Sequence, residues 1–301
     1  MSKATLVILA AGMGSRYGGL KQIDTVGSNG ESIIDFSIYD AIRAGFDKIV
    51  LIIRKEHEEA FRKQLTDKVS KKVEVTFAYQ NLEDIPAGIT IPEGREKPWG
   101  TTHALLACKG IVDGPFMICN ADDFYGPKSF ELMYKFLTEE VKDGHYGMVG
   151  YPLVNTLTDN GTVTRGLCKT ENDLLTDIVE IQKIRKNGLV AEYEENSTWV
   201  QASKEMLCSM NYWGFTPAIF DACEDIFATY IKENIADNPM KCEHVIPTAV
   251  GDLVKSKKIE VKVMATDEKW FGVTYKEDKP NVVKNLLDYK KEGLYPEDLW
   301  K

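Results

Sequence analysis

Glycine and cationic residues follow the first apolar segment of the chain in a pattern suited to binding phosphate. The segment Ala4–Ala10 is continuously apolar, and Gly12, Gly14, Arg16 and Lys21 come soon after it. Glycines at the end of a strand let backbone N–H groups approach phosphate oxygens closely. Arginine and lysine add donors that stay protonated at neutral pH. The pattern therefore predicts a grip for a polyphosphate.

Two better-known phosphate motifs come close to this segment, and both fail. The dinucleotide fingerprint GxGxxG requires a glycine where Tyr17 stands, and the second expected strand leads into Arg54 instead of an acidic residue. The P-loop GxxxxGK[ST] fails because Leu20 separates the second glycine from Lys21, and Gln22 replaces the serine or threonine. Both motifs are therefore excluded.

Two adjacent carboxylates follow another apolar segment. Asp122 and Asp123 come just after Phe116–Cys119, which reads as a buried strand. Carboxylate oxygens are ligands that Mg²⁺ prefers, so Asp122 is the predicted metal ligand. The alternative is that Asp122 caps the turn before Pro127. Adjacent residues at a strand end point to different sides, which makes Asp123 the weaker metal candidate.

The elements that position these residues alternate between strand and helix in the first half of the chain. We expect strands at Ala4–Ala10, Lys48–Arg54, Val73–Gln80 and Pro115–Asn120. We expect helices after a capping box at Ser32, and at Lys55–Val69, Thr101–Lys109 and Ser129–Lys142. This alternation predicts an α/β fold with a parallel sheet and helices on its faces.

The second half of the chain is richer in short strands. We expect strands at Tyr146–Pro152, Thr162–Lys169, Leu174–Lys183, Leu189–Tyr193, Ile259–Ala265 and Trp270–Tyr275. We expect helices at Pro217–Glu233, Glu243–Ser256 and Lys279–Glu292. No linker separates two folding units, so we predict a single domain over residues 1–301 whose second half is built onto the first sheet.

Composition limits the classes of partner. The 301 residues carry a net charge of −9 with 44% hydrophobic and 28% charged residues, which argues against a nucleic-acid partner. No segment approaches the roughly 20 apolar residues of a membrane helix, and no signal peptide is recognised. The six cysteines include no CxxC pair, which predicts free thiols and a cytoplasmic location. A homo-oligomer is left open.

The segment Leu9-Ala10-Ala11-Gly12-Met13-Gly14-Ser15-Arg16, with Lys21-Gln22, resembles the signature of the sugar-phosphate nucleotidyltransferases, the NDP-sugar pyrophosphorylases. Further segments are similar to landmarks of that family in the same order: Gly100–Leu105, Met117–Asp123 and Asn211–Phe215. The resemblance implies a three-layer, Rossmann-like fold with a mixed, mainly parallel sheet and a β-rich extension on the substrate side. Residues 1–150 would bind nucleotide, and residues 151–301 would bind sugar phosphate.

The resemblance also implies the nucleotide site. Arg16, Lys21 and Asp122 would act on the reacting phosphates, with Mg²⁺ held by Asp122. The triphosphate, ribose and base would contact Leu9, Ala11, Gly12, Gly14, Ser15, Gln80, Gly100 and Thr101. Gln80 would read the edge of the base, although a plain polar strand end is the alternative. His103, within the third expected helix, is interpreted as structural.

On the sugar-phosphate side, the resemblance implies contacts from Gly161, Glu180, Lys183 and Asn211. Arg185 is the alternative to Lys183, because the family lysine that follows the glutamate directly is replaced here by Ile181.

The chain departs from the family at Gly272, where many relatives carry a second metal-binding aspartate in a Trp-x-Asp segment. Three readings follow from this departure. A nearby carboxylate replaces the aspartate, or Asp122 holds the metal with phosphate and water, or catalysis has been lost. The nearby carboxylates are Asp267, Glu268, Glu277 and Asp278.

The predicted reaction is transfer of a nucleotidyl group from an NTP, with UTP favoured, to a sugar-1-phosphate. It releases pyrophosphate and needs no protein nucleophile. One alternative is cytidylyl transfer to phosphocholine or a similar small alcohol phosphate, with an aromatic cage from Tyr212, Trp213 and Trp270. The other is a non-catalytic nucleotide or sugar-nucleotide sensor.

Overall fold

The computed structural model describes residues 4–12, 20–158, 161–273 and 276–301. Four parallel strands form one half of its sheet in the order β4-β1-β2-β3. Their bounds are β1 Thr5–Leu9, β2 Lys48–Ile53, β3 Glu74–Tyr79 and β4 Phe116–Asn120. Each matches an apolar segment expected from the sequence. The predicted parallel order therefore holds in this half.

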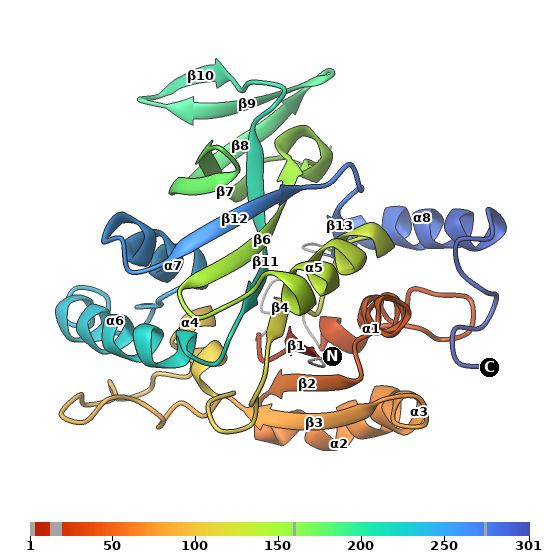
Figure 1. Cartoon of the computed structure of the whole chain (residues 1–301), viewed down its shortest axis with the longest axis horizontal. Coiled ribbons are helices and arrows are strands. Elements are labelled where there is room, and N and C mark those ends of the chain that lie inside the picture. The colour runs from red at the N-terminus through yellow and green to blue at the C-terminus, as the bar shows by residue number, and fades with distance from the viewer. Residues whose placement is uncertain (1–3, 13–19, 159–160, 274–275) are drawn as a thin grey trace.

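The sheet continues beyond β4 with mixed directions (Figure 1). Strand β11 lies antiparallel between β4 and β6, and β12 is parallel to β6, whereas β7–β10 pair antiparallel as an extension. The bounds are β6 His145–Pro152, β7 Val163–Glu171, β8 Leu174–Asn187, β9 Val190–Glu195, β10 Thr198–Gln201, β11 Leu207–Phe215 and β12 Glu260–Ala265. A mixed sheet with a β-rich extension was expected, but β10 was not.

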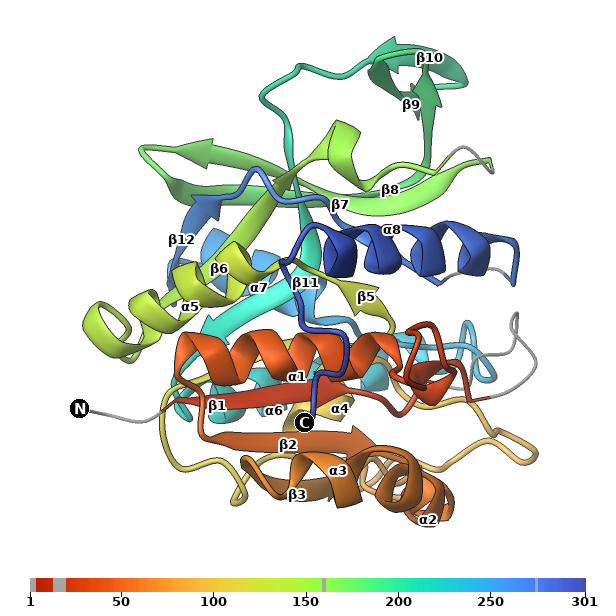
Figure 2. The same ribbon diagram turned by 90° about the vertical axis from the view of Figure 1, so that its right-hand side faces the viewer.

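Helices cover both faces of this sheet (Figure 2). Leu6 and Ile8 of β1 pack with α1 and α5 on one face, and Val7 packs with α4, α6 and α7 on the other. The bounds are α1 Ile33–Ala44, α4 Thr101–Leu106, α5 Pro127–Glu139, α6 Ile219–Asn234 and α7 Ile246–Lys255. Alternate β1 residues thus enter two separate cores, which confirms the predicted three layers.

Two predicted elements differ in the structure. The helix expected over Lys55–Val69 is broken into a 3-10 turn Lys55–His57, α2 Glu58–Phe61, a π-helical stretch Arg62–Thr66 and α3 Asp67–Val69. Its apolar residues Phe61, Leu65 and Val69 are nevertheless all buried in the core, although the helix that carries them is irregular. The strand expected over Trp270–Tyr275 is reduced to β13, Phe271–Gly272, paired with β5, Asp123–Phe124, while residues 274–275 lie outside the described part.

Short 3-10 turns at Lys21–Ile23, Leu153–Thr156 and Lys276–Asp278 connect the main elements. No helix of the described residues is long and apolar enough to cross a membrane.

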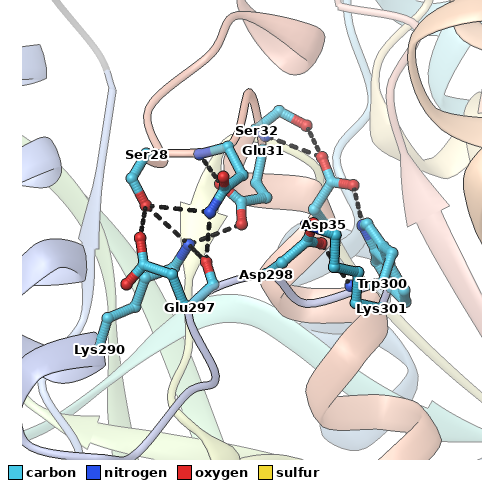
Figure 3. A network of polar contacts seen from close by, with 10 residues as sticks. Ser28, Glu31, Ser32, Asp35, Lys290, Glu297, Asp298, Trp300 and Lys301 are labelled. Carbon is cyan, nitrogen blue, oxygen red and sulfur yellow. Dashed lines mark hydrogen bonds and ion pairs between the residues drawn. The ribbon is translucent and has the colours of Figure 1, made fainter.

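The last helix, α8 Lys279–Lys291, and the tail after it bind the segment that follows the glycine-rich loop. Lys290 and Glu31 form an ion pair of 2.6 Å, and both side chains are almost fully buried. The same Lys290 ammonium donates to the Glu297 carbonyl at 2.6 Å and to the Ser28 hydroxyl at 3.2 Å (Figure 3). We call these contacts, together with the two described next, the C-terminal clasp.

The other contacts of the clasp lie at each side of the Lys290 ion pair. Trp300 donates its indole N–H to the buried Asp35 carboxylate at 2.7 Å, and Asp35 also accepts from the Ser32 N–H at 2.8 Å (Figure 3). Lys279 pairs at 2.6 Å with Asp24, and Asp24 lies three residues after Lys21 in the chain. The clasp therefore holds residues 24–35 against the C-terminal segment.

We predict that Lys290→Met lowers the free energy of unfolding by about 3–5 kcal/mol, because it leaves the Glu31 carboxylate buried without its counter-charge. Denaturant unfolding measures the change. Lys291→Met is the matched control, since Lys291 is exposed and pairs at the surface with Asp288 at 3.2 Å, so its effect should stay within about 0.5 kcal/mol. Equal effects of the two changes would contradict the role given to the buried pair.

A second buried carboxylate links α1 to the tail. Asp40 accepts a hydrogen bond of 2.6 Å from the Tyr295 hydroxyl, and Arg43 lies 3.8 Å away. Burial raises the pKa of Asp40 from 3.8 to about 8, and the bond from Tyr295 and the charge of Arg43 lower it only in part. The folded protein therefore binds this proton more tightly than the unfolded chain.

We predict that the native protein loses stability relative to Asp40→Asn as the pH rises from about 5 to 8. The pKa of Asp40 is raised on folding, so the unfolded chain releases the proton first and stability falls through this window. Urea unfolding at several pH values measures the difference. The exposed Asp237→Asn is the control, and a difference between native protein and Asp40→Asn that stays flat with pH would refute the prediction.

Candidate active site

A cavity of about 750 Å³ opens at the carboxyl ends of β1, β3 and β4. It gathers the described residues that the sequence predicted for the nucleotide site and its metal: Leu9, Ala11, Gly12, Lys21, Gln80, Gly100, Thr101 and Asp122. Gly14, Ser15 and Arg16 lie outside the described residues. Segments far apart in the chain therefore meet at this cavity. The roles of these residues stay predictions.

The register of the parallel strands explains why these residues meet. Leu9 is level with Ile52 and with Asn120, so β1, β2 and β4 end together. Beyond that level, the Ala121 N–H donates to the Leu9 carbonyl at 3.1 Å, and the Gln80 N–H donates to the Ile53 carbonyl at 3.0 Å. The chain therefore leaves each strand at the same edge of the sheet, where open α/β sheets bind ligands.

Lys21 and Asp122 form an ion pair across this edge. Both side chains are about one-fifth exposed, 19% and 22%, so ligands can reach them. The Lys21 ammonium also lies 3.5 Å from the Val273 carbonyl, and Gln22 donates to the Gly12 carbonyl at 2.7 Å. Lys21, in the segment after the glycine-rich loop, is thus in contact with the residues that follow β4 and β13.

Asp123 is almost fully buried and does not line the cavity. Its carboxylate accepts from the Asn120 side-chain amide at 2.8 Å and lies 3.2 Å from the Tyr125 hydroxyl. Burial raises the pKa of Asp123 to about 7, helped by the charge of Asp122 and opposed by the Asn120 hydrogen bond. The two adjacent aspartates therefore differ in environment, as the alternation of strand side chains predicted.

Asn120 lines the cavity and connects it to β11. The Asn211 amide donates to the Asn120 side-chain oxygen at 2.9 Å, and Trp213 donates its indole N–H to the Asn211 oxygen at 3.1 Å. Asn211 adopts a left-handed conformation, with φ 59°, at an irregularity in the pairing of β11 with β6. Asn211, which was predicted to contact the sugar phosphate, is therefore linked to the cavity wall through Asn120. The sequence analysis did not single out Asn120.

Gln80 and His103 form a second polar group at the cavity wall. Gln80 donates from its side-chain nitrogen to the Gly100 carbonyl at 3.0 Å and lies 3.2 Å from His103 Nδ1. His103 Nε2 lies 2.7 Å from the Asp84 carbonyl. Burial lowers the pKa of His103, which keeps the ring neutral. Gln80 is therefore held in one orientation by its neighbours.

Gly272 lies directly against the aspartate pair. A Cβ atom at this position would be 2.5 Å from an Asp123 carboxylate oxygen and 2.9 Å from the Asp122 carbonyl. Glycine is required here because the Asp123 side chain fills the space that a second aspartate would need. The glycine and the buried Asp123 are thus two parts of one arrangement.

Two of the four carboxylates near Gly272 have partners other than the cavity residues. Asp267 pairs with the Lys128 ammonium at 3.1 Å, and Glu268 accepts from the Lys128 backbone N–H at 3.1 Å. In the part of the chain that the structure describes, no group of three or more His, Cys, Asp or Glu residues is arranged to hold a metal. Among the described carboxylates that line the cavity, Asp122 is the one that pairs with Lys21.

Three residues predicted for the sugar-phosphate side lie away from this cavity. Gly161 lines a separate hollow of about 520 Å³ in the extension, together with Arg185 and Trp199. Lys183 pairs with Glu194 at 2.5 Å, and Glu180 is exposed on β8. Strands β7–β10 carry these residues beyond the carboxyl ends of the parallel strands, which the sequence pattern did not reveal.

The opposite wall of the cavity comes from segments that the sequence analysis did not assign to the site. Arg95 ties them together: its guanidinium donates to the carbonyls of Pro239 and Cys242 at 2.5 and 2.6 Å and stacks on Trp99 at 3.5 Å. The wall residues from these segments are Gly94, Glu96, Lys97, Pro98, Met240, Lys241, Glu243 and Val245. The only signal in the sequence was the presence of Arg95 in a polar stretch, and its burial is seen only in the structure.

The aromatic cage of the phosphocholine alternative is not formed. Tyr212 and Trp213 are fully buried in the two cores, so neither ring is accessible. Trp270 is covered by the Arg165 guanidinium, 4.6 Å from the ring centre. Arg165, which the sequence analysis missed, is also close enough for its charge to lower the pKa of Asp123.

Comparison with known proteins agrees with this geometry. A family model described as nucleotidyl transferase matches residues 5–273. The chain belongs to the nucleotidyl transferase family. The predicted enzyme class is thereby confirmed. No curated protein matches the chain in a sequence search.

Solved structures of the same fold cover nearly the whole chain. A UDP-glucose pyrophosphorylase complexed with UDP-glucose has a TM-score of 0.60 and 17% identity, covering 96% of this chain and 99% of that one. The inositol-1-phosphate CTP transferase from T. maritima has a TM-score of 0.63 and 12% identity, covering 97% and 98%. A putative glucose-1-phosphate thymidylyltransferase from Bacillus anthracis has a TM-score of 0.60 and 14% identity, covering 95% of this chain and 96% of that one. These likenesses confirm the predicted fold.

We predict that Gly272→Ala lowers the free energy of unfolding by about 1–3 kcal/mol, because its methyl group overlaps the Asp123 carboxylate. Denaturant unfolding of Gly272→Ala, Asp123→Ala and the double variant measures this in a double-mutant cycle. The alanine at position 272 should cost less once the carboxylate is gone. Additive effects of the two changes would show that the two positions do not compete for space.

Proposed function

We propose that the protein transfers a nucleotidyl group from a nucleoside triphosphate, with UTP favoured, to a sugar-1-phosphate. The observation that carries the proposal is the Lys21–Asp122 ion pair at the edge of the 750 Å³ cavity. A cation and an accessible carboxylate are thereby held beside the strand ends that carry the predicted nucleotide contacts. Membership of the nucleotidyl transferase family supports the same reaction class.

The chemistry asks for charge compensation more than for a nucleophile. An oxygen of the sugar phosphate attacks the α-phosphorus, a new P–O bond forms, and the bond to the bridging oxygen breaks as pyrophosphate leaves. The attacking group is already an anion, so no protein base has to remove a proton. Lys21 donates to the phosphate oxygens, and the backbone at Ala11 and Gly12 lies at the same edge. Gly14, Ser15 and Arg16 complete the grip in this proposal.

The residues present fit a magnesium ion. Asp122 offers an accessible carboxylate to the cavity, and Mg²⁺ is commonly held by one or two carboxylates together with substrate phosphates and waters. When bound, the ion neutralises charge on the reacting phosphates. Asp123 is engaged by Asn120 and Tyr125, so we assign the metal to Asp122 alone. This is the second of the three readings of Gly272.

We propose that the acceptor phosphate approaches from the side of Asn120 and Asn211. The sequence-predicted contacts at Gly161, Glu180 and Lys183 belong to the extension, and they stay predictions for the distal part of the acceptor. The buried state of Tyr212 and Trp213 disfavours the phosphocholine alternative. The paired Lys21 and Asp122 disfavour a sensor, which has less need of charged groups at the reacting phosphates. The cytoplasmic location, the absence of nucleic-acid partners and any homo-oligomer stay predictions.

The proposal is tested by measuring pyrophosphate release with Mg²⁺ from a panel of nucleoside triphosphates and acceptors. The acceptors are hexose-1-phosphates, N-acetylhexosamine-1-phosphates, inositol-1-phosphate and phosphocholine. Release that requires a sugar-1-phosphate supports the proposal. Release with phosphocholine alone favours the alternative enzyme, and nucleotide binding without release across the panel favours the sensor.

We predict that Lys21→Ala lowers kcat by about 10²–10³-fold, because it removes a charge partner of the transferring phosphate. Asp122→Asn should abolish metal-dependent turnover, and its melting temperature should stay close to that of the native protein. The exposed Lys63→Ala is the control and should keep native activity. Near-native turnover in Lys21→Ala would sink the role of Lys21, and unfolding of Asp122→Asn would favour the capping role of Asp122.

A further inference from the structure

Arg165, on β7, carries a positive charge that no carboxylate of the described residues balances. Its guanidinium donates from Nε to the Thr156 hydroxyl at 3.3 Å and from Nη2 to the Thr156 carbonyl at 2.6 Å. Nη1 donates to the Thr164 carbonyl at 2.8 Å. These partners are all neutral, and within the described part of the chain no Asp or Glu oxygen is paired with Arg165.

The guanidinium of Arg165 is largely withdrawn from water. It covers the Trp270 ring at 4.6 Å from the ring centre, and burial lowers the pKa of Arg165. An arginine nevertheless stays protonated in a protein. A buried charge without a counter-charge is unfavourable, and carbonyl groups offset its cost only in part. Such an arrangement is expected where an anionic ligand supplies the missing charge.

Arg165 retains hydrogen-bond donors for such a ligand. A guanidinium has five N–H groups, and the bonds to Thr156 and Thr164 use one on each nitrogen. One N–H on each of Nη1 and Nη2 remains. The side chain keeps partial exposure, so a ligand can reach it. The indole N–H of Trp270 is also unpaired among the described residues. Donors on two neighbouring nitrogens suit the two oxygens of one phosphate group.

Arg165 lies close to the aspartate pair. A Cβ atom at position 272 would be 3.2 Å from the Trp270 ring and 2.5 Å from the Asp123 carboxylate. The ring that the guanidinium covers is therefore next to Asp123. In agreement with this placement, the charges of Arg165 and Lys21 both lower the pKa of Asp123. Two cations are therefore near this carboxylate.

The two cations reach the site from different segments. Lys21 lines the cavity that gathers the predicted nucleotide contacts, and Arg165 does not. Arg165 lies on the extension, where the adjacent Gly166 pairs with Ser209 of β11. Strand β11 leads from there to Asn211, on the side from which the acceptor phosphate approaches in the proposed function. Arg165 is therefore the cation on the acceptor side.

We propose that Arg165 binds the phosphate group of the acceptor and thereby determines that the acceptor is a phosphorylated compound. This inference rests on the proposed function. The acceptor phosphate has to approach a triphosphate of like charge, and a guanidinium beside it reduces their repulsion. The guanidinium is free to do this because its charge is not shared with a carboxylate of the described residues.

The pairing of β7 with β8 allows the position of this charge to be tested. Arg165 lies directly opposite Ile181 in the antiparallel ladder, and residues in this relation share one face of a sheet. Ile181 and Trp270 both pack at the edge of the same core. A lysine at position 181 has a long, flexible stem, so it can bring an ammonium group to the place that the guanidinium occupies.

The experiment measures the kinetics of pyrophosphate release for the native protein and for Arg165→Met, with the triphosphate and sugar-1-phosphate that the native protein uses. We expect the KM of the acceptor to rise by about 10–100-fold, because a charge-assisted contact with its phosphate is lost. The Kd of the triphosphate, measured by calorimetry without acceptor, should stay within about twofold. Arg62→Met is the matched control, because Arg62 also lies over an aromatic ring, Phe77, but is paired with Glu58 at 2.8 Å.

Two further variants separate the charge of Arg165 from its hydrogen bonds to Thr156 and Thr164. Arg165→Gln keeps an amide donor and removes the charge, so it should raise the acceptor KM as well, and it gives this measurement if Arg165→Met does not fold. Adding Ile181→Lys to either neutral variant restores a cation without those bonds. We expect it to recover the acceptor KM by about fivefold or more, whereas Ile181→Met in the same background should recover none.

The outcomes separate this inference from the proposed function. A native acceptor KM in a folded neutral variant overturns the role of Arg165 and leaves the proposed reaction standing. An equal rise in the acceptor KM and the triphosphate Kd, without recovery by Ile181→Lys, shows a structural role and also overturns the inference. A native protein that releases no pyrophosphate with any acceptor overturns the proposed function together with this inference.

Discussion

The Lys21–Asp122 ion pair is the interaction on which the rest of the site depends. It joins the segment that follows β1 to the end of β4, and its charges face the cavity. An ion pair that solvent can reach contributes little stability by itself, so the backbone must hold both partners in place. Asp122 is fixed by the register of β4 with β1. Lys21 is fixed by the C-terminal clasp, whose Lys279–Asp24 and Lys290–Glu31 contacts hold the chain just beyond it.

The environment of Asp123 shows how the site is arranged around Gly272, where the family resemblance implies a second aspartate. Two carboxylates at one metal repel each other unless the ion is present. Here Asp123 is removed from the cavity, engaged by Asn120 and Tyr125, and packed against Gly272. Gly272 therefore leaves room for the Asp123 carboxylate, because a Cβ atom at position 272 would overlap it. One accessible carboxylate remains beside Lys21, and phosphate oxygens and water can supply the other ligands of Mg²⁺.

The strand ends could be predicted from the sequence because buried parallel strands are short apolar runs, and ligands bind where they end. The glycines after β1, Gln80 after β3 and Asp122 after β4 follow from that rule. The clasp could not be predicted, because Lys290 and Glu31 lie 259 residues apart and nothing local marks either as buried. The orientation of Gln80 was equally hidden, since it depends on the Gly100 carbonyl, which lies 20 residues further along the chain. The extension carries Glu180 and Lys183 away from the cavity by pairings that alternation does not encode.

The two halves of the site differ in how rigidly they are built. The cavity walls at Gln80 and Arg95 are held by buried polar bonds: Gln80 to Gly100 and His103, and Arg95 to the carbonyls of Pro239 and Cys242. Each of these groups would be costly to leave unpaired, so they exist in one arrangement. The extension instead pairs its surface charges with one another, as Lys183 does with Glu194. Surface pairs are easily exchanged without loss of the fold. In the proposed function, the nucleotide side is therefore built into the core, whereas the extension residues that the sequence predicted for the acceptor are ones that substitution can change freely.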